Sequence, residues 1–452
     1  MARAKKEAVL TPEERLQAAL VPDWEWPYKL PGNWCCTRLG SVSTIVGGGT
    51  PSSGVAEYYE NGTIPWISPA DLSGYSDMYI SHGAKNITEL GLEKSSARLM
   101  PAGTVCLSSR APIGYVVIAQ NDISTNQGFK SMLPSPCFIS EYLYWYLKGN
   151  KELLESYASG TTFLEISGGK TAQVEFPLAP LAEQQRIVDR IESLFAKLDE
   201  AKEKAQAVVD SFETRKAAIL HKAFTGELTK KWRKSANTRW VYKKIKDCCK
   251  LGSGGTPSRK VPDFYKGDIP WIKTGEIEWN DIYDTEEKIT QSAIDNSSAR
   301  CYKPGVVLVA MYGMGVTRGK ASILRVQAAT NQAVCVLEPQ RALLYNRYLL
   351  YYFMRNYWDI REKAVGGNQL NLSLTIIKEL NIEIPPIDEQ MEIVQILDDL
   401  FAKEQQAKES AEAVLDQIDL IKKSILTRAF RGELGTNDPS EESAVELLKS
   451  VL

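Results

Sequence analysis

The chain has 452 residues, enough for about three average domains. Its 54 Lys and Arg nearly balance its 56 Asp and Glu, and the net charge of −2 argues against a uniformly basic coat protein of nucleic acid. Only two histidines are present, His82 and His221, which disfavours His-rich metal sites and most His-based acid–base catalysis.

The N-terminal sequence lacks the apolar segment of a signal peptide, and no apolar run reaches the ~18 residues needed to span a membrane. The eight cysteines include no CxxC pair, so we interpret them as reduced and mostly buried thiols. These features predict a cytoplasmic protein. Residues 1–30 are predicted to be an extension with a short helix at 15–20, because Thr11, Pro12 and Glu14 match the pattern of a helix N-terminus.

The dominant feature of the sequence is an internal repeat with a period of about 206 residues. The two copies differ most between Gly103 and Thr125 and between Gly305 and Thr330, so we interpret the chain as one scaffold with two divergent inserts. Short motifs of the first copy recur in order in the second: Trp34, 49–52, 64–67, 95–98 and 125–127 correspond to Trp240, 255–258, 269–272, 297–300 and 330–332.

The first half of each copy, 31–179 and 235–384, contains short β-like runs between glycine turns, followed by a tyrosine-rich helical run. This pattern predicts two α+β domains. Trp66 and Trp271, which occur in both copies, are expected in the core. The repeated Thr-Asn-Gln segments at 125–127 and 330–332 are expected to be structural, since a residue that reads sequence should differ between the copies.

A long helix follows each globular part, in 180–234 and 385–434. Apolar residues from Ile187 to Phe212 recur in steps of four and three, which is a heptad pattern, and the second copy keeps it with one polar break at Glu404. The two apolar stripes predict an intramolecular antiparallel coiled coil, and the opposite net charges of the two segments, +3 and −5, favour that pairing.

Small residues near the middle of both helices make a finer prediction about the coiled coil. Antiparallel pairing is expected to place Ala201 and Ala205 of the first helix against Ala407 and Ala411 of the second, with the two axes closest there.

The C-terminal tail, 435–452, is predicted to form a helix at 442–452, since Asp438 and Pro439 repeat the pattern seen at Thr11 and Pro12. We leave two interpretations of the two terminal helices open: frayed tails, or docking helices for a partner subunit.

A search for catalytic motifs finds little. Asp263, Glu286 and Lys288 fit the loose PD…ExK pattern of Mg²⁺-dependent nucleases, which we keep as an alternative. The glycine-rich segment 313–320 has Ala321 where a phosphate-binding loop needs Ser or Thr. No dinucleotide-binding or serine-hydrolase motif occurs. We therefore predict no catalytic residue, metal site or cofactor in this chain.

Each long helix begins with a closely similar sequence, PLAEQQRIV at 180–188 and PIDEQMEIV at 386–394, and follows an unlike globular domain carrying GGTPS and IPWI elements. This arrangement resembles the specificity subunits of type I restriction-modification systems over residues 31–434. The resemblance implies a non-catalytic subunit of a DNA methyltransferase and restriction endonuclease. A protein-only coiled-coil adaptor remains a further alternative.

In that family, each globular part is a target recognition domain that reads one half of a split DNA sequence, so unlike domains imply an asymmetric target. The resemblance also implies that the helices space the domains and bind two adenine methyltransferase subunits. Restriction and translocase subunits complete the complex. S-adenosylmethionine, ATP and Mg²⁺ are expected on the partner subunits.

Side chains that read bases must reach the edges of the grooves, whereas phosphate contacts position the protein without specifying sequence. For each base-contact candidate the alternative is a solvated surface side chain, and for the two glycine-rich loops the alternative is a tight turn. We predict base contacts from Ser108, Ser109, Arg110, Tyr312, Arg318 and Lys320, phosphate contacts from Lys130 and Lys273, and close DNA approach by Thr161, Asn368 and Gln369 in glycine-rich loops. The predicted subunit-docking residues are Gln184, Phe195, Gln390 and Phe401.

The near-neutral total charge hides an uneven distribution. Residues 31–179 carry a net charge of −3, and residues 240–384 carry +5. We expect weak DNA binding by the chain alone, with partner subunits supplying much of the phosphate contact, especially beside the acidic first domain.

Overall fold

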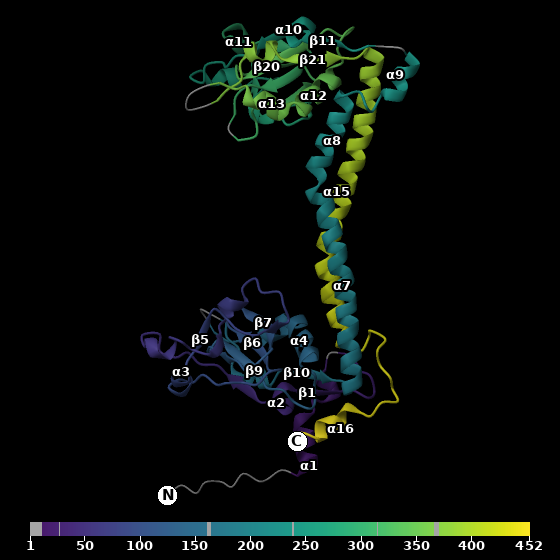
Figure 1. Ribbon diagram of the computed structural model, residues 1–452. Helices are drawn as coiled ribbons and strands as arrows, with labels where there is room; N and C mark the ends of the chain where they lie inside the picture. Colours follow the sequence, from purple (N-terminus) through teal and green to yellow (C-terminus); the bar gives the residue numbers. More distant parts are fainter. Residues whose placement is uncertain (1–10, 27, 161–163, 237–238, 314, 366–369) are drawn as a thin grey trace. The chain divides into compact units, whose positions relative to one another are not determined.

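The computed structural model describes residues 11–452 except 27, 161–163, 237–238, 314 and 366–369 (Figure 1). The chain forms two compact units. Unit 1 comprises Met1–Lys204 together with Val414–Leu452, and unit 2 comprises Ala205–Ala413. Among the described residues, no helix is both long and apolar enough to cross a membrane.

Unit 1 is an α+β domain with a five-stranded sheet in the order β2-β9-β6-β7-β4, a three-stranded sheet β5-β3-β8, and the antiparallel pair β1-β10. Its elements are α1 (Pro12–Ala19), β1 (Cys35–Arg38), α2 (Leu39–Val42), β2 (Ile45–Gly47), β3 (Ile64–Ile67), β4 (Tyr79–Ile80), β5 (Lys85–Ile87), α3 (Glu89–Glu93), β6 (Val105–Ser109), β7 (Ile113–Ala119), β8 (Ser124–Thr125), β9 (Phe129–Met132), α4 (Ser140–Gly149), α5 (Lys151–Ser156), α6 (Gly168–Ala172), β10 (Glu175–Leu178) and α16 (Ala444–Lys449). The long helix α7 (Leu181–Asp210) begins in this unit.

Unit 2 repeats this topology with a five-stranded sheet β12-β20-β17-β18-β14, a four-stranded sheet β15-β13-β19-β16, and the pair β11-β21. Its elements are α8 (Phe212–Phe224), α9 (Lys230–Ala236), β11 (Val241–Lys244), α10 (Ile245–Cys248), β12 (Cys249–Ser253), β13 (Ile269–Ile272), β14 (Asp281–Ile282), β15 (Lys288–Ile289), α11 (Gln291–Asp295), β16 (Cys301–Tyr302), β17 (Val307–Ala310), β18 (Ala321–Leu324), β19 (Ala328–Thr330), β20 (Val334–Pro339), α12 (Asn346–Arg355), α13 (Tyr357–Glu362), α14 (Leu374–Lys378) and β21 (Asn381–Ile384). The helix α15 (Ile387–Ala429) begins here.

The tyrosine-rich helices α4 and α12 hold the two-stranded sheets in place. In unit 1 the Tyr142 hydroxyl donates to the Pro177 carbonyl oxygen at 2.9 Å. In unit 2 the Tyr348 and Tyr352 hydroxyls each donate at 2.8 Å, to the carbonyl oxygens of Glu383 and Asn381. Each ring is buried while its hydroxyl satisfies a strand carbonyl, which explains why tyrosine rather than phenylalanine occupies these positions.

The motifs shared by both repeats are structural, as predicted. Trp66 and Trp271 are buried, and their indole nitrogens donate to the carbonyl oxygens of Gly49 at 2.9 Å and Gly255 at 3.1 Å. In the Thr-Asn-Gln segments, the side-chain oxygen of Asn126 accepts from the Gly128 amide at 2.8 Å. The corresponding Asn331 oxygen accepts from Ala333 at 3.0 Å.

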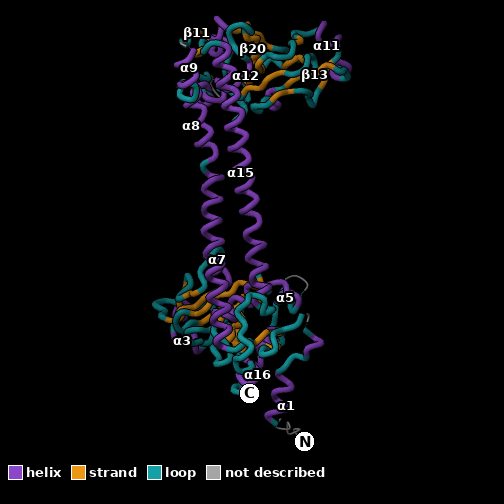
Figure 2. The backbone as a smooth tube through the Cα atoms, turned by 90° about the vertical axis from the view of Figure 1, so that its right-hand side faces the viewer, coloured by secondary structure: helices purple, strands orange, loops and turns teal. Residues whose placement is uncertain are grey.

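The long helices pair in opposite directions within each unit, as predicted (Figure 2). In unit 1, Lys422 of α15 forms an ion pair with Asp199 of α7 at 2.5 Å, while the first turns of α7 share a core with the end of α15. In unit 2, α8 runs against the first half of α15, with Arg215 and Glu404 paired at 2.7 Å. The polar break at Glu404 in the heptad pattern therefore has an arginine partner on the facing helix.

Two details of the helices differ from the sequence predictions. The first long segment is interrupted at Ser211, which separates α7 from α8, whereas α15 is continuous over 43 residues. The predicted inward alanine cluster is wrong at Ala407, which is exposed, although Ala205 and Ala411 are buried. Lys408, next to Ala407, lies over the Phe212 ring at 4.9 Å, so the neighbouring position turns toward solvent.

Both terminal helices belong to unit 1 and lie next to each other (Figure 1). The Thr11 side chain and Glu14 form the predicted capping box of α1. The second helix starts later than predicted, because Ser443 rather than Asp438 is its N-cap residue. Ala19 of α1 and Leu448 of α16 join the core of unit 1, so the described parts of these helices are packed rather than frayed.

All eight cysteines are free, and all except Cys301 are buried. Burial raises the pKa of the Cys106 thiol to about 12. The Cys106 thiol therefore stays protonated at neutral pH and acts as a small apolar side chain, in line with the sequence interpretation.

Candidate nucleic-acid interface

The most divergent segment of unit 2 is the loop of residues 311–320 between β17 and β18. Three glycines in it, Gly313, Gly315 and Gly319, have positive φ angles of 144°, 60° and 90°. These angles are costly for residues with a Cβ atom, so the glycines allow the loop to fold back on itself. The Gly319 amide donates to the Ala310 carbonyl oxygen at 2.8 Å, which closes the base of the loop.

A second element, α13, holds this loop from outside. The Arg361 guanidinium donates to the carbonyl oxygens of Arg318 at 2.5 Å and Gly315 at 2.7 Å, and the Tyr357 hydroxyl donates to the Val316 carbonyl oxygen. Arg361 also lies over the rings of Tyr357 and Trp358, at 5.1 and 5.6 Å from their centroids. Described residues of the loop are therefore held by hydrogen bonds from groups more than 40 residues away in sequence.

The two arginines of this surface lie close enough to affect each other electrostatically. Desolvation and the positive charge of Arg361 lower the pKa of the Arg318 guanidinium. Within the part of the chain that the structure describes, neither arginine forms an ion pair with a carboxylate, and the Arg318 side chain donates only to the Leu370 carbonyl oxygen. Two neighbouring cations without a described counter-ion create a local positive potential that attracts an anion such as a phosphate, and their guanidinium groups can also donate to the neutral acceptor atoms of a guanine edge.

Large apolar and aromatic side chains surround the arginine pair and remain exposed. Isolated exposed apolar residues are normal, but a group of them beside unpaired cations is typical of a binding surface. The group consists of Tyr312, Val316, Trp358, Val365 and Leu370. We refer to these residues together with Arg318 and Arg361 as the loop surface of unit 2.

The other predicted cations of unit 2 are already paired. Lys320 is mostly buried and forms an ion pair with Glu278. Lys273 contacts Glu286 and Glu287, each at 2.9 Å. A lysine held by carboxylates is a weaker candidate for phosphate than a free one, since the carboxylates offset its charge. Of the three predicted contacts in the divergent stretch, Tyr312 and Arg318 fit best.

The equivalent connection in unit 1, between β6 and β7, is much shorter. Arg110 lies at its tip and faces Glu165 at 3.7 Å, and Lys130 contacts the same carboxylate at 3.4 Å. Both Arg110 and Glu165 are partly exposed, so this surface presents a cation and an acceptor side by side. A carboxylate can accept from the cytosine amino group and an arginine can donate to guanine.

The structure removes Ser108 and Ser109 from the candidate set. Both are fully buried in β6. The Ser108 hydroxyl donates to the Pro112 carbonyl oxygen at 2.7 Å and accepts from the Tyr115 amide at 2.8 Å, so it shapes the turn from inside. Ser109 accepts from the Lys130 ammonium at 3.2 Å. Strand β6 lies between β9 and β7 and is buried along its whole length, so both hydroxyls lie in the interior. The sequence pattern did not distinguish this buried strand from a surface loop.

Three other predicted residues, Thr161, Asn368 and Gln369, lie outside the described residues. The described residues around them are informative in unit 2. Val365 and Asn371, on either side of 366–369, form a β-bridge, and the Leu372 amide donates to the Met311 carbonyl oxygen at 3.0 Å. The described residues that flank 366–369 therefore lie next to the start of the loop 311–320.

The predicted subunit-docking glutamines are internal. Gln184 donates to the carbonyl oxygens of Cys137 and Ala179 and accepts from the Ile139 amide, at 2.8–3.1 Å. Gln390 makes the same three contacts in unit 2. Both are fully buried, so they connect each long helix to its own domain and cannot contact another subunit.

Phe195 and Phe401 also face their own domains. The Phe195 ring packs edge-on against Trp145 at 5.0 Å, and Phe401 packs against Tyr351 at 5.6 Å. Each ring also has a lysine of the opposite helix over it, Lys422 and Lys216 respectively. Both phenylalanines are only half-buried, and their predicted docking role stays a prediction.

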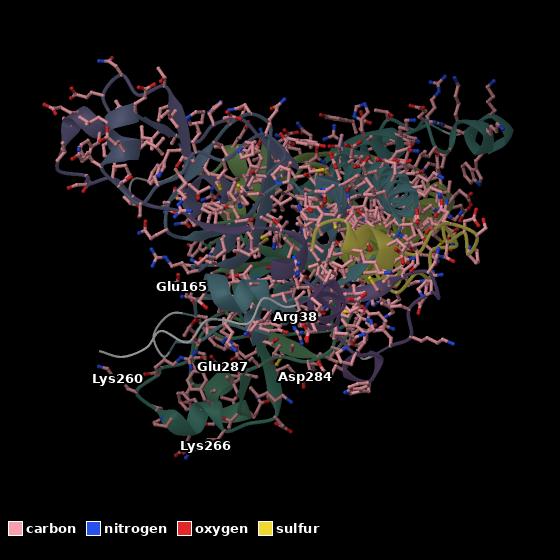
Figure 3. The ribbon with its side chains drawn as sticks, turned by 90° about the horizontal axis from the view of Figure 1, so that it is seen from below. Arg38, Glu165, Lys260, Lys266, Asp284 and Glu287 are labelled. Carbon is pink, nitrogen blue, oxygen red and sulfur yellow. The ribbon has the colours of Figure 1, made fainter. Side chains whose placement is uncertain are left out.

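The three residues of the nuclease alternative are each paired with a different oppositely charged side chain. Asp263 is paired with Lys266 at 2.8 Å, Glu286 with Lys273 at 2.9 Å, and Lys288 with Asp284 at 3.1 Å. Figure 3 shows the labelled Lys266 and Asp284 at different places on the surface. In the described parts of the chain, no group of three His, Cys, Asp or Glu side chains could hold a metal ion.

Trp358 and Arg361 are the candidate residues that the sequence analysis missed. They lie on α13, which occupies the position of α5 in the repeat, and there the sequence changes from KELLES to YWDIRE. Glu155 of α5 pairs with Lys151, whereas Arg361 is directed to the loop. This divergence in an otherwise gapless part of the repeat is the signal that would have identified them.

Comparisons with known proteins are consistent across most of the chain. Residues 31–209 and 237–413 each match the family described as type I restriction modification DNA specificity domain. The specificity subunit of the type I restriction enzyme MjaIX from Methanocaldococcus jannaschii is 29% identical over 390 residues, covering 83% of this chain and 88% of that protein. The EcoKI specificity subunit of Escherichia coli is 24% identical, covering 90% of each chain.

A solved structure shares the fold. The HsdS subunit from Thermoanaerobacter tengcongensis superposes with a TM-score of 0.65 at 18% identity, covering 91% of this chain and 100% of that one. At this level of identity the similarity supports the fold of two α+β domains with long helices.

Proposed function

Because the chain belongs to the family of type I restriction-modification DNA specificity domains, we propose that it is the sequence-reading subunit of a type I restriction-modification complex. Each globular domain reads one half of a bipartite, asymmetric DNA target. The proposed target recognition domains comprise 31–179 and 235–384, and the proposed spacer helices 180–234 and 385–434.

One observation carries this proposal: the two units share their scaffold and differ where a ligand would be read. The Trp and Thr-Asn-Gln contacts and the buried glutamines recur in both units. The connection after β6 presents Arg110 beside Glu165, while the longer connection after β17 presents Arg318 beside Arg361. Unlike groups on like scaffolds favour two different half-sites rather than a palindrome.

The chemistry of the two surfaces supports unequal modes of contact. In unit 2, the unpaired arginines Arg318 and Arg361 suit guanine edges or phosphates, and Tyr312, Val316 and Trp358 add apolar contact to bases. In unit 1, Glu165 offsets the charge of Arg110 and Lys130. Unit 1 therefore depends more on partner subunits for phosphate contacts.

The long helices are proposed to space the two domains and to bind two methyltransferase subunits, with restriction and translocase subunits completing the complex. Adenine methylation and DNA cleavage then belong to those partners, which would hold S-adenosylmethionine, ATP and Mg²⁺. This chain contributes recognition and assembly and no catalytic group, and we place it in the cytoplasm.

Sequencing of adenine methylation in cells with and without the gene tests this function directly. We expect one bipartite motif with unlike halves to lose methylation on deletion and to regain it on complementation. A protein-only adaptor would leave the methylation pattern unchanged. A nuclease centred on Asp263 would cleave DNA with Mg²⁺ as a purified single chain, and Asp263→Ala would abolish that activity.

A further inference from the structure

Strands β1 and β11 occupy equivalent positions in the two units. In the same register, β1 pairs with β10 and β11 pairs with β21, but the segments on their other edges differ. Cys36 is opposite Pro177, and Tyr242 is opposite Glu383. In unit 1, the second edge of β1 is covered by the N-terminal segment: the Val21 amide donates to the Cys36 carbonyl oxygen at 2.9 Å. Leu20 forms an antiparallel bridge with Thr37.

In unit 2, the corresponding edge of β11 is open. Within the described part of the chain, β11 pairs only with β21. Val241 and Tyr242 are 46% and 67% exposed, whereas the equivalent Cys35 and Cys36 are 8% and 6% exposed. An apolar strand edge with unpaired main-chain groups is a template for the addition of another strand.

In unit 1, terminal segments cover more of the surface than the edge of β1. Helix α16 packs on the same domain, where the Cys137 thiol donates to the Leu447 carbonyl oxygen at 3.4 Å. The equivalent of Cys137 in unit 2 is the half-buried Leu343. The residues that follow Leu343 line a cavity of about 420 Å³ that no described segment fills. The apolar part of its lining includes Leu344, Tyr345, Ile387 and the exposed Met391.

We propose that the open edge of β11 binds an extended segment of the methyltransferase subunit, which adds a third strand to β11-β21. This inference rests on the proposed function, since it assigns the occupant to that complex. Unit 1 shows the kind of segment that fits: an amphipathic helix with Glu13 and Glu14 in its first turn, followed by the apolar Leu20 and Val21.

Charge around the open edge favours an acidic flank on the incoming segment. Lys244 and Lys246 share the Glu379 carboxylate, at 2.5 and 2.7 Å. Lys243 and the exposed Arg239 form no ion pair with any described residue, so they remain available to a partner. The edge thus combines a main-chain template, two apolar side chains and two cations, and a segment with apolar residues beside Asp or Glu satisfies all three.

Hydrogen exchange measured by mass spectrometry on the full chain tests this docking edge. We expect exchange of the peptide 239–248 to slow at least tenfold when the methyltransferase subunit is added, because the added strand would bond the free amides. Unchanged exchange in a complex that demonstrably forms would overturn the proposal. Slowing that depends only on the concentration of this chain would assign the edge to a second copy and would also overturn it.

A pair of variants gives an independent readout. The double substitution Val241→Asp and Tyr242→Asp should weaken methyltransferase binding at least tenfold, since it places two carboxylates on the docking edge. Tyr283→Asp is the matched control, because Tyr283 is a 65% exposed tyrosine of the same unit. Unchanged exchange in peptides from β17 and β20 verifies that both variants fold. Equal binding by both variants would contradict the proposal.

The outcomes separate this inference from the proposed function. A complex with slowed exchange at 239–248 that methylates DNA without sequence preference contradicts the reading function and supports the docking edge. A complex that methylates one bipartite motif but leaves the exchange of 239–248 unchanged supports the function and refutes the docking edge.

Discussion

Arg361 donates a hydrogen bond to the main-chain oxygen of Arg318 at 2.5 Å, so one arginine of the loop surface holds the loop that carries the other. Their positive charges lie near each other without a described carboxylate between them, which costs free energy in the isolated chain. An anionic ligand would remove that cost, which supports the proposed contact of this pair with DNA.

Arg318→Ala should weaken specific DNA binding by the assembled complex by about 1–3 kcal/mol and relax only the half-site read by unit 2. The measurement is competition between DNA duplexes altered in one half-site at a time. Arg300→Ala provides the control, since Arg300 is an exposed arginine of the same unit. Relaxation at the other half-site, or an equal effect of both variants, would contradict the assignment.

Arg361→Lys should keep the charge of the loop surface but lose the bidentate support of Arg318 and Gly315. We expect a loss of discrimination at the unit 2 half-site with little change in the salt dependence of binding, because the number of cations near phosphate is unchanged. Arg361→Ala should lower both the discrimination at the unit 2 half-site and the salt dependence of binding. Full discrimination by Arg361→Lys would show that the guanidinium does not position the loop.

Gln184→Leu should lower the free energy of unfolding of unit 1 by about 2–3 kcal/mol, because it leaves buried main-chain groups without partners. Gln185→Leu is the neighbouring control, because the Gln185 side-chain amide donates to the exposed Asp189 and to no other residue that the structure describes. Chemical denaturation measures the free energy of unfolding of both variants. At temperatures where both variants are folded, methyltransferase affinity should be unchanged; a selective loss of affinity would restore the docking role of Gln184.

The Arg215–Glu404 ion pair should show a coupling energy of about 0.5–1 kcal/mol, since both side chains are partly exposed. A double-mutant cycle with Arg215→Ala and Glu404→Ala in denaturation of unit 2 measures it. Rising salt should reduce the coupling. The Lys204–Glu200 pair on α7, which is well exposed, serves as the reference and should give a smaller value.

Glu379 should make stability depend on pH in the acid range. Hydrogen bonds from Lys244 and Lys246 lower the pKa of Glu379 from 4.5 to about 2. The stabilisation is complete above the unfolded-state pKa of 4.5 and is lost as the pH falls toward 2. The difference in unfolding free energy between wild type and Glu379→Gln should therefore shrink over this interval, and a difference independent of pH would contradict the assignment.

Much of the scaffold was predictable because its signals are periodic or repeated. The heptad pattern predicted the antiparallel helices, and the repeat identified Trp66 and Trp271 as core residues. The proposed recognition residues were harder to predict, since Arg318 and Arg361 lie 43 residues apart in sequence and come together only in the fold. Ser108 and Ser109 were misplaced because the exact turn between two strands decides whether a hydroxyl is inside or outside.

The division of the chain between the units has a consequence for biosynthesis. Unit 2 is one continuous segment, whereas unit 1 needs both the N-terminal residues and those after Val414. The Phe430 ring packs against Tyr142 and Tyr146 at 5.1 Å in each case, so the core of unit 1 stays incomplete until nearly the whole chain has left the ribosome. Unit 2 can therefore complete its core from one continuous segment, whereas the core of unit 1 also requires the 39 residues Val414–Leu452, which are translated after unit 2.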